Sequence, residues 1–88
     1  MFEHIAYVTV DRHSNTPILK HLGRLYNKYP DWVFISSEIP PTDKGVCRQQ
    51  LLQSAEYVVV IGDISSVDMY PVTYALLHNI KIIYEELV

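Results

Sequence analysis

The stretch from residue 51 to residue 84 constrains this fold more than any other part of the chain. Residues 57–61 read Tyr-Val-Val-Val-Ile, an apolar run typical of a strand that is covered on both faces, as in a parallel sheet. Gly62 ends this run, and residues 80–84 form a second apolar strand. We therefore expect a strand–helix–strand unit, with the right-handed crossover that such units prefer.

A helix is expected between these two strands. Ser65 and Ser66 offer caps for its start, and Asn79 suits its stop. One helical face would carry Val72, Ala75, Leu76 and Asn79. The spacing predicts that this face packs on the sheet.

Two further strands and two further helices are expected before this unit. Residues 5–10 and 32–36 are mostly apolar and rich in β-branched or aromatic side chains, which favours strands. Between them, Thr16 is expected to be a helix N-cap and Pro17 the first helical residue. A second helix is expected from Asp43 to about residue 54.

The first of these helices has an apolar side and a polar side. The apolar side is expected to carry Ile18, Leu19, Leu22, Leu25, Tyr26 and Tyr29. The polar side is expected to carry Lys20, His21, Arg24, Asn27 and Lys28. Gly23 is an unfavourable residue inside a helix, and we expect it to let the helix approach the sheet closely.

This order of elements predicts a single α/β domain over residues 1–88. Helical crossovers between all strands imply a four-stranded parallel sheet with helices on both faces, in the three-layer manner of Rossmann-like and flavodoxin-like folds. We expect the strand order 2-1-3-4, with the topological switch point between the first and third strands.

Charge and cysteine content limit the possible partners. The net charge is −3, and the seven basic residues look scattered along the sequence without a basic stripe, which argues against nucleic-acid binding. Cys47 is the only cysteine, so no internal disulfide can form. Because no signal peptide or membrane-length apolar run is seen, we expect a cytoplasmic protein without membrane contact.

The predicted ligand site is the edge of the sheet beyond the carboxyl ends of the strands. Ligands of open parallel sheets bind there, at the switch point, and two helix N-termini facing this edge suit an anion such as phosphate. The loops after the first and third strands supply the candidate binding residues Asp11, His13, Ser14, Asn15, Asp63, Ser65, Ser66 and Asp68.

Structural roles compete with binding for several of these side chains. An aspartate such as Asp63 after a strand is usually a turn or capping residue, and Ser65 and Ser66 suit caps. Cys47 suits a small buried hydrophobe. The histidines and the lone cysteine have no metal-site spacing, and no phosphate-binding glycine loop is present, so we expect no metal or cofactor.

Residues 51–84 also carry a resemblance to a known family. Ala55 and Glu56 precede the apolar run, and residues 74–82 read Tyr-Ala-Leu-Leu-His-Asn-Ile-Lys-Ile. This arrangement resembles the C-terminal half of nucleoside 2-deoxyribosyltransferase-like domains, small versions of which occur in phage and bacteria. By that resemblance Asp63 matches the family acid that touches the sugar.

The resemblance breaks at the family nucleophile, which is a glutamate on the helix after the third strand. Pro71 or Val72 stands at that position, and neither can attack a sugar carbon. The glycine-containing loop after the family's first strand is also replaced, by residues 11–15. The resemblance therefore implies that transferase chemistry has been lost, unless Asp68 substitutes for the glutamate.

Three functions follow from these patterns. The first is a non-catalytic binding domain for a nucleotide-like or nucleoside-like ligand at the predicted edge. The second is a small phage-type modulator that binds a host protein, suggested by the small size and the seven tyrosines. The third is a nucleoside or nucleotide glycosidase that uses Asp63 or Asp68.

A homo-oligomer is also expected. The second and fourth strands would be apolar sheet edges, and open edges invite pairing with another chain. A small domain also gains core burial from a partner. The candidate interface residues are Tyr70, Tyr74 and Tyr84, unless these rings cover the domain's own core.

Overall fold

The computed structural model describes residues 4–36 and 52–86. The strands are β1 (His4–Val10), β2 (Trp32–Ile35), β3 (Tyr57–Ile61) and β4 (Lys81–Glu85). The helices are α1 (Ile18–Lys28), α3 (Met69–Leu77) and a short 3-10 turn, η1 (Ile64–Ser66). The expected second helix lies outside the described residues except for residues 52–54, which are helical.

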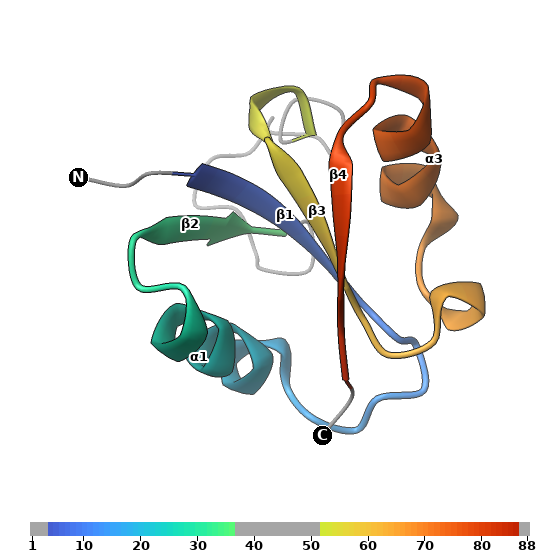
Figure 1. Ribbon diagram of the computed structural model, residues 1–88. Helices are drawn as coiled ribbons and strands as arrows, with labels where there is room; N and C mark the ends of the chain where they lie inside the picture. The colour runs from blue at the N-terminus through green and yellow to red at the C-terminus, as the bar shows by residue number, and fades with distance from the viewer. Residues whose placement is uncertain (1–3, 37–51, 87–88) are drawn as a thin grey trace, which may run out of the picture.

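The four strands form one parallel sheet in the order β2-β1-β3-β4, and Figure 1 shows β1 and β3 at its centre. Val59 of β3 lies opposite Val8 of β1 on one side and Ile83 of β4 on the other. The predicted Rossmann-like sheet architecture and strand order are therefore confirmed, and the loops after β1 and β3 meet at the topological switch point.

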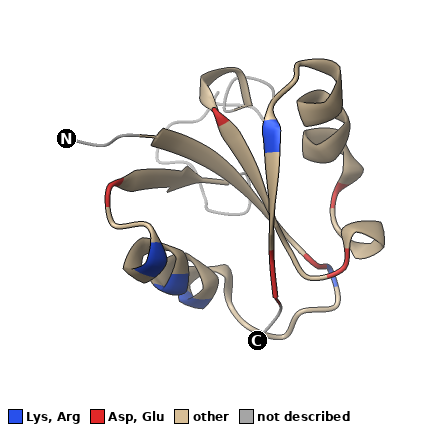
Figure 2. Cartoon of the chain, in the orientation of Figure 1, with Lys and Arg blue, Asp and Glu red and all other residues tan. Residues whose placement is uncertain are grey.

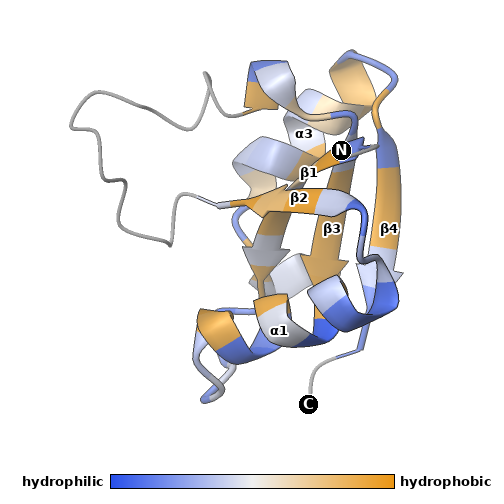
Figure 3. Ribbon diagram, turned by 90° about the vertical axis from the view of Figure 1, so that its left-hand side faces the viewer, coloured by the Kyte–Doolittle hydropathy of each residue, from blue (hydrophilic) through white to orange (hydrophobic). Residues whose placement is uncertain are grey.

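Alternate side chains of the central strands build one core on each face of the sheet. Val59 belongs to the core that includes Leu22 of α1. The next residue, Val60, belongs to the core that includes Val72 and Ala75 of α3. A fully buried side chain of this size contributes about 1.5–3 kcal/mol relative to an exposed one, so both helices are held by the strands they cover. Figure 3 shows the apolar strands between α1 in front and α3 behind.

Helix α1 turns a different stripe toward the sheet from the one expected. His21, Leu22 and Leu25 are buried, whereas Leu19 is 70% exposed and Tyr26 is also exposed. The burial of His21 and the exposure of Leu19 and Tyr26 correct the predicted faces. Residues three or four positions apart along a helix share one face, and from residue 18 this face passes through residues 21, 22 and 25. Leu19 and Tyr26 lie beside that face.

The start of α1 also differs by one residue from the prediction. Pro17, with φ −58° and ψ 144°, is the N-cap, and Ile18 is the first helical residue. The ψ angle of Pro17 is that of an extended backbone, so Pro17 precedes the helix. Thr16 lies one residue further from the helix. The backbone N–H of Thr16 instead donates to the Ser14 hydroxyl at 3.2 Å.

Aspartates, and not the expected serines, begin the helical segments after β3. Asp63 caps η1 and Asp68 caps α3, while Ser65 and Ser66 lie inside the 3-10 turn. Val67 separates the two segments and is buried, which explains why the chain leaves helical geometry there: the break turns this side chain into the core.

Helix α3 ends close to the expected residue, but the face that it turns toward the sheet differs from the expected one. The helix ends at Leu77, and Asn79 has φ 56°, the left-handed conformation that asparagine tolerates at a helix end. Leu76 was expected on the inner face and is 69% exposed. The buried residues of α3 are Pro71, Val72 and Ala75. The contact with the sheet is therefore made by the first part of the helix and not by its last residues.

Candidate functional site

The carboxylate of Asp11 ties together the loops that follow β1 and β3. One oxygen accepts a hydrogen bond from the backbone N–H of His13 at 2.8 Å, and the other accepts from that of Asp63 at 3.1 Å. The backbone N–H of Arg12 also donates to the carbonyl of Ser66 at 2.8 Å. The predicted closeness of the two loops is therefore confirmed, and Asp11 is the buried residue that holds them together.

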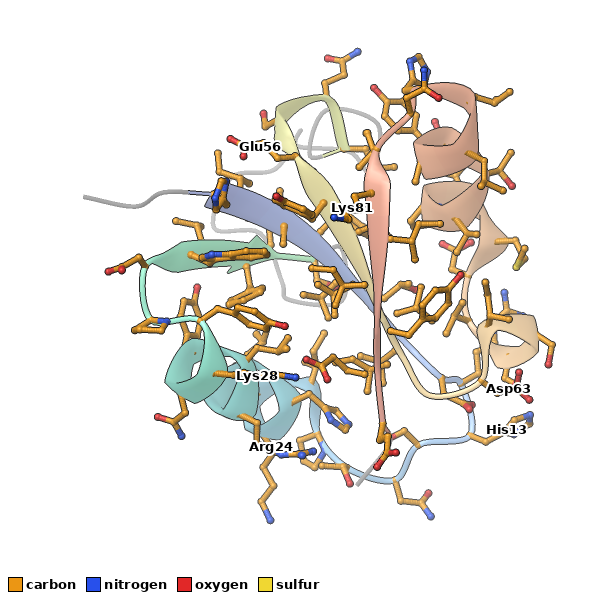
Figure 4. All side chains as sticks on the ribbon, viewed as in Figure 1. His13, Arg24, Lys28, Glu56, Asp63 and Lys81 are labelled. Carbon is orange, nitrogen blue, oxygen red and sulfur yellow. The ribbon has the colours of Figure 1, made fainter. Side chains whose placement is uncertain are left out.

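Asp63 uses its carboxylate as a cap. Oδ1 accepts hydrogen bonds from the backbone N–H of Ser65 at 3.0 Å and from the Ser65 hydroxyl at 2.9 Å. The backbone bond, followed by the hydroxyl bond, holds the pKa of Asp63 below its ordinary value; desolvation opposes them, and the charge of nearby His13 adds a lesser lowering effect. Figure 4 shows Asp63 and His13 at the same end of the molecule. The side chain is therefore an ionised cap.

The second acid of this loop has the same kind of role. Asp68 accepts a hydrogen bond from the backbone N–H of Tyr70 at 3.1 Å and so begins α3. Pro71 and Val72, which the resemblance to deoxyribosyltransferase-like domains would place at the nucleophile position, are buried in the inner face of α3. The structure thus brings the predicted residues of this loop together, and the bonds to Asp63 and Asp68 described here hold the 3-10 turn and the start of α3.

The loop after β1 directs one of its predicted residues toward α1. The hydroxyl of Ser14 lies 3.3 Å from Nε2 of His21. The neighbouring side chains of His13 and Asn15 are exposed. Of the three, only Ser14 reaches a buried side chain of the helix.

His21 was predicted on the polar side of α1, but it lies on the buried side. It is only 2% exposed, and burial, with a smaller contribution from the Arg24 charge, lowers the pKa of its imidazole. The ring is therefore neutral near pH 7, and a neutral imidazole has one donor and one acceptor nitrogen. Ser14 faces one of these nitrogens, Nε2.

A pocket of about 410 Å³ opens beside His21, between α1 and the carboxyl ends of β3 and β4. Its helix wall is formed by His21, Arg24, Leu25, Asn27 and Lys28. Its sheet wall is formed by Ile61, Glu85 and Glu86. This volume lies within the range of about 300–1,000 Å³ typical of small-molecule sites.

One ion pair joins the two walls of this pocket. Nζ of Lys28 lies 2.9 Å from Oε1 and 3.2 Å from Oε2 of Glu85. The hydrogen bond to Glu85 is the largest cause that raises the pKa of Lys28. Among the described residues, Arg24 forms no ion pair, so Lys28 neutralises Glu85 while Arg24 keeps its charge at the pocket.

The basic residues are also less scattered than they look in the sequence. Lys20, Arg24 and Lys28 recur every four residues and line one side of α1, as Figure 2 shows. Helical geometry brings residues at this spacing onto one face. This line corrects the expectation that the chain has no basic stripe, and its last two members reach the pocket.

The pocket therefore lies at the predicted edge of the sheet but not at the predicted loops. Residues 11–15 and 63–68 meet at the switch point, whereas the pocket lies at the ends of β3 and β4 on the α1 face. None of the eight predicted binding residues lines it. The four-residue spacing of Arg24 and Lys28 was the sequence signal for it. Its acidic side depends on where β4 ends, which a sequence locates poorly.

The described ranges, 4–36 and 52–86, hold neither a cluster of metal ligands nor a helix of membrane-spanning character. These residues contain no group of three or more histidine, cysteine, aspartate or glutamate side chains that could hold a metal ion. None of the helices described there has the length and apolar character needed to cross a membrane. Cys47, expected to be a buried hydrophobe, lies outside the described residues.

Comparisons with known proteins return nothing for this chain: no family model matches it, and no curated protein or solved structure does.

Proposed function

We propose that this protein is a non-catalytic binding domain for a nucleotide-like small molecule, which it holds in the pocket between α1 and the ends of β3 and β4. One observation carries the proposal: the pocket has a helix wall with cationic side chains, a sheet wall with carboxylates, and an apolar floor between them. A mononucleotide offers a matching group to each of these surfaces.

The helix wall suits a phosphate group. The Arg24 guanidinium has five N–H donors in a planar fork that matches phosphate oxygens. Lys28, which is held in its ion pair with Glu85, lies one helical turn away, and the amide of Asn27 adds uncharged donors. A phosphate at this wall would receive charge-assisted hydrogen bonds, which are about twice as strong as neutral ones.

The sheet wall suits the hydroxyl groups of a sugar. Glu85 and Glu86 bring two carboxylates to the end of β4. Ionised carboxylates are acceptors only, so they pair with the donor hydroxyls of a ribose. The side chain of Glu85 is 19% exposed, so its contacts are shielded from bulk water.

The floor of the pocket suits the flat face of a base. Leu25 and Ile61 line it with aliphatic carbon, and both belong to the core on the α1 face. Neither side chain can move far without disturbing that core. The floor is therefore preformed, as small-molecule sites usually are, and it is narrow, because Leu25 is 4% and Ile61 2% exposed.

Calorimetric titration with adenosine 5′-monophosphate, adenosine and inorganic phosphate tests the proposal. We expect the monophosphate to bind more tightly than adenosine or phosphate alone, because only it meets both walls and the floor. Arg24→Ala should weaken binding of the monophosphate by about tenfold or more, since a hydrogen bond to a charged group is worth roughly 1.5–3 kcal/mol.

Lys20→Ala is the matched control. Lys20 stands one turn before Arg24 on the same side of α1 and does not line the pocket, so its loss removes the same charge without removing a contact. The affinity of Lys20→Ala for the monophosphate should stay within about twofold of that of the wild type, since screening weakens distant charges. An equal loss for both variants, or no saturable binding of any nucleotide, would refute the proposal.

A further inference from the structure

We propose that two copies of this chain pair through β4, edge to edge and antiparallel, about a twofold axis at Ile83. Strand β4 is the outer strand of the sheet on its side. Lys81 stands at one end of β4 and Glu85 at the other, as the basic and acidic ends of the strand show in Figure 2. These features make the strand complementary to a second copy of itself.

The backbone of β4 is oriented for such a pairing. The carbonyl of Glu85 accepts a hydrogen bond from the N–H of Gly62 at 3.0 Å, which directs Glu85 toward β3. Because successive residues of a strand direct their N–H and C=O groups to opposite sides, Ile82 and Tyr84 direct theirs to the outer edge. These two residues are therefore the ones that can bond to a second strand.

Charge complementarity selects the register. With the axis at Ile83, Lys81 of each copy lies opposite Glu85 of the other, and Ile82 lies opposite Tyr84. An antiparallel register centred one residue earlier, on Ile82, would place Lys81 opposite Ile83 and lose both charge pairs. Directly opposite side chains have Cβ atoms about 4.5–5.5 Å apart, and opposite charges there stabilise pairing.

The exposed apolar side chains near β4 also favour pairing with a second copy. Tyr84 is 62% exposed although Ile82, two residues earlier on the same face, packs against the core under α3. Leu76 and Leu77, in the last turn of α3, are also exposed, and α3 lies beside β4 in Figure 1. The proposed pairing covers Tyr84 with Ile82 of the second copy.

The three tyrosines expected at an interface differ in how exposed they are. Tyr74 packs against its own core, and its ring stacks on that of His78 with centroids 4.2 Å apart. Tyr70 and Tyr84 are exposed. The register at Ile83 uses Tyr84 directly.

The pairing would also change the pocket, a consequence that rests on the proposed function. Lys81 of the second copy would lie opposite Glu85 and compete with Lys28 for its carboxylate. That competition would leave Lys28 more available to an anionic ligand. The dimer itself is independent of any ligand.

Sedimentation velocity with complementary charge variants tests the dimer. The wild type should sediment as twice the 10.2 kDa mass of one chain. Lys81→Glu places like charges opposite each other at both ends of the pairing, and so does Glu85→Lys, so each variant alone should be monomeric. An equimolar mixture of the two should dimerise, because each position then meets the opposite charge.

Two controls separate this result from damage to the fold. Lys28→Ala removes the ion pair within the chain and should remain dimeric, and circular dichroism should show the wild-type spectrum for every variant. A wild type that is monomeric at micromolar concentration would overturn the proposal. A mixture of folded charge variants that stays monomeric would also overturn it.

A cysteine pair tests the register without altering any charge. In a Cys47→Ser background, Ile83→Cys places a thiol opposite its own copy, in a pair close enough for a disulfide. Mild oxidation should therefore link two Ile83→Cys chains. Ile82→Cys is the control: its copies lie apart across the axis, so it should stay unlinked. Equal linking of both variants would contradict the register.

Discussion

A Cβ atom placed on Gly62 would lie 2.5 Å from the Cβ of Asp11. Gly62 also has φ +97°, a conformation that residues with a side chain rarely adopt. Gly62→Ala should therefore lower the free energy of unfolding by about 2–4 kcal/mol, from backbone strain and overpacking together. Urea denaturation measures this change, and a loss within about 0.5 kcal/mol, as at ordinary surface sites, would contradict it.

Gly23 gives the opposite prediction. It was expected to allow a close approach of α1 to the sheet, but a Cβ there would meet nothing within 4 Å, so that expectation is wrong. Gly23→Ala should raise the free energy of unfolding by about 1 kcal/mol, because alanine restricts the unfolded chain and favours the helix. A loss of stability in the same urea experiment would show that α1 needs the glycine.

Asp11→Asn tests the tie between the two loops. The asparagine oxygen can accept one of the two backbone hydrogen bonds, but its NH₂ group would face the other donor N–H. We expect a loss of about 1.5–3 kcal/mol in the free energy of unfolding. Asp31→Asn, at an exposed position, should change it by less than about 0.5 kcal/mol. Equal effects of the two substitutions would remove the structural role given to Asp11.

His21 predicts a pH dependence of stability. Its pKa is lowered in the folded chain by burial and by Arg24, whereas in the unfolded chain it is near about 6.5. Between these values the unfolded chain binds more protons, so this contribution to stability is complete above the unfolded pKa and is lost as the pH falls through the folded one.

The measurement compares the wild type with His21→Gln. The difference in free energy of unfolding between the two should grow as the pH rises from about 5 to about 7 and then level off. A constant difference over this range would mean that the folded imidazole keeps its ordinary pKa.

The sheet was predictable because its strands are apolar runs bounded by turn residues. β3 has the bounds expected from the sequence, and the bounds of β1, β2 and β4 shift by one residue. In a parallel sheet the strands must be apolar on both faces, so composition and burial agree there. On α1 they disagree, because Leu19 is apolar and exposed while His21 is polar and buried.

The site was harder to predict because it depends on two segments that the sequence separates widely. The loops of Asp11 and Asp63 were placed correctly by topology alone. The pocket needs Lys28 of α1 to reach Glu85 of β4, and this contact joins elements whose relative position follows from packing. Hydrogen bonds also decided the role of Asp63, since a capping carboxylate and a binding carboxylate look alike in a sequence.

The position at which a nucleotide binds can be measured directly by ¹H–¹⁵N correlation spectra recorded during titration with adenosine 5′-monophosphate. We predict saturable shifts for the backbone amides of residues 21–28 and of Glu85 and Glu86, with much smaller shifts for the same residues in Arg24→Ala. Shifts confined to residues 11–15 and 63–68 would place the ligand at the switch-point loops and contradict the pocket, as would spectra that do not change.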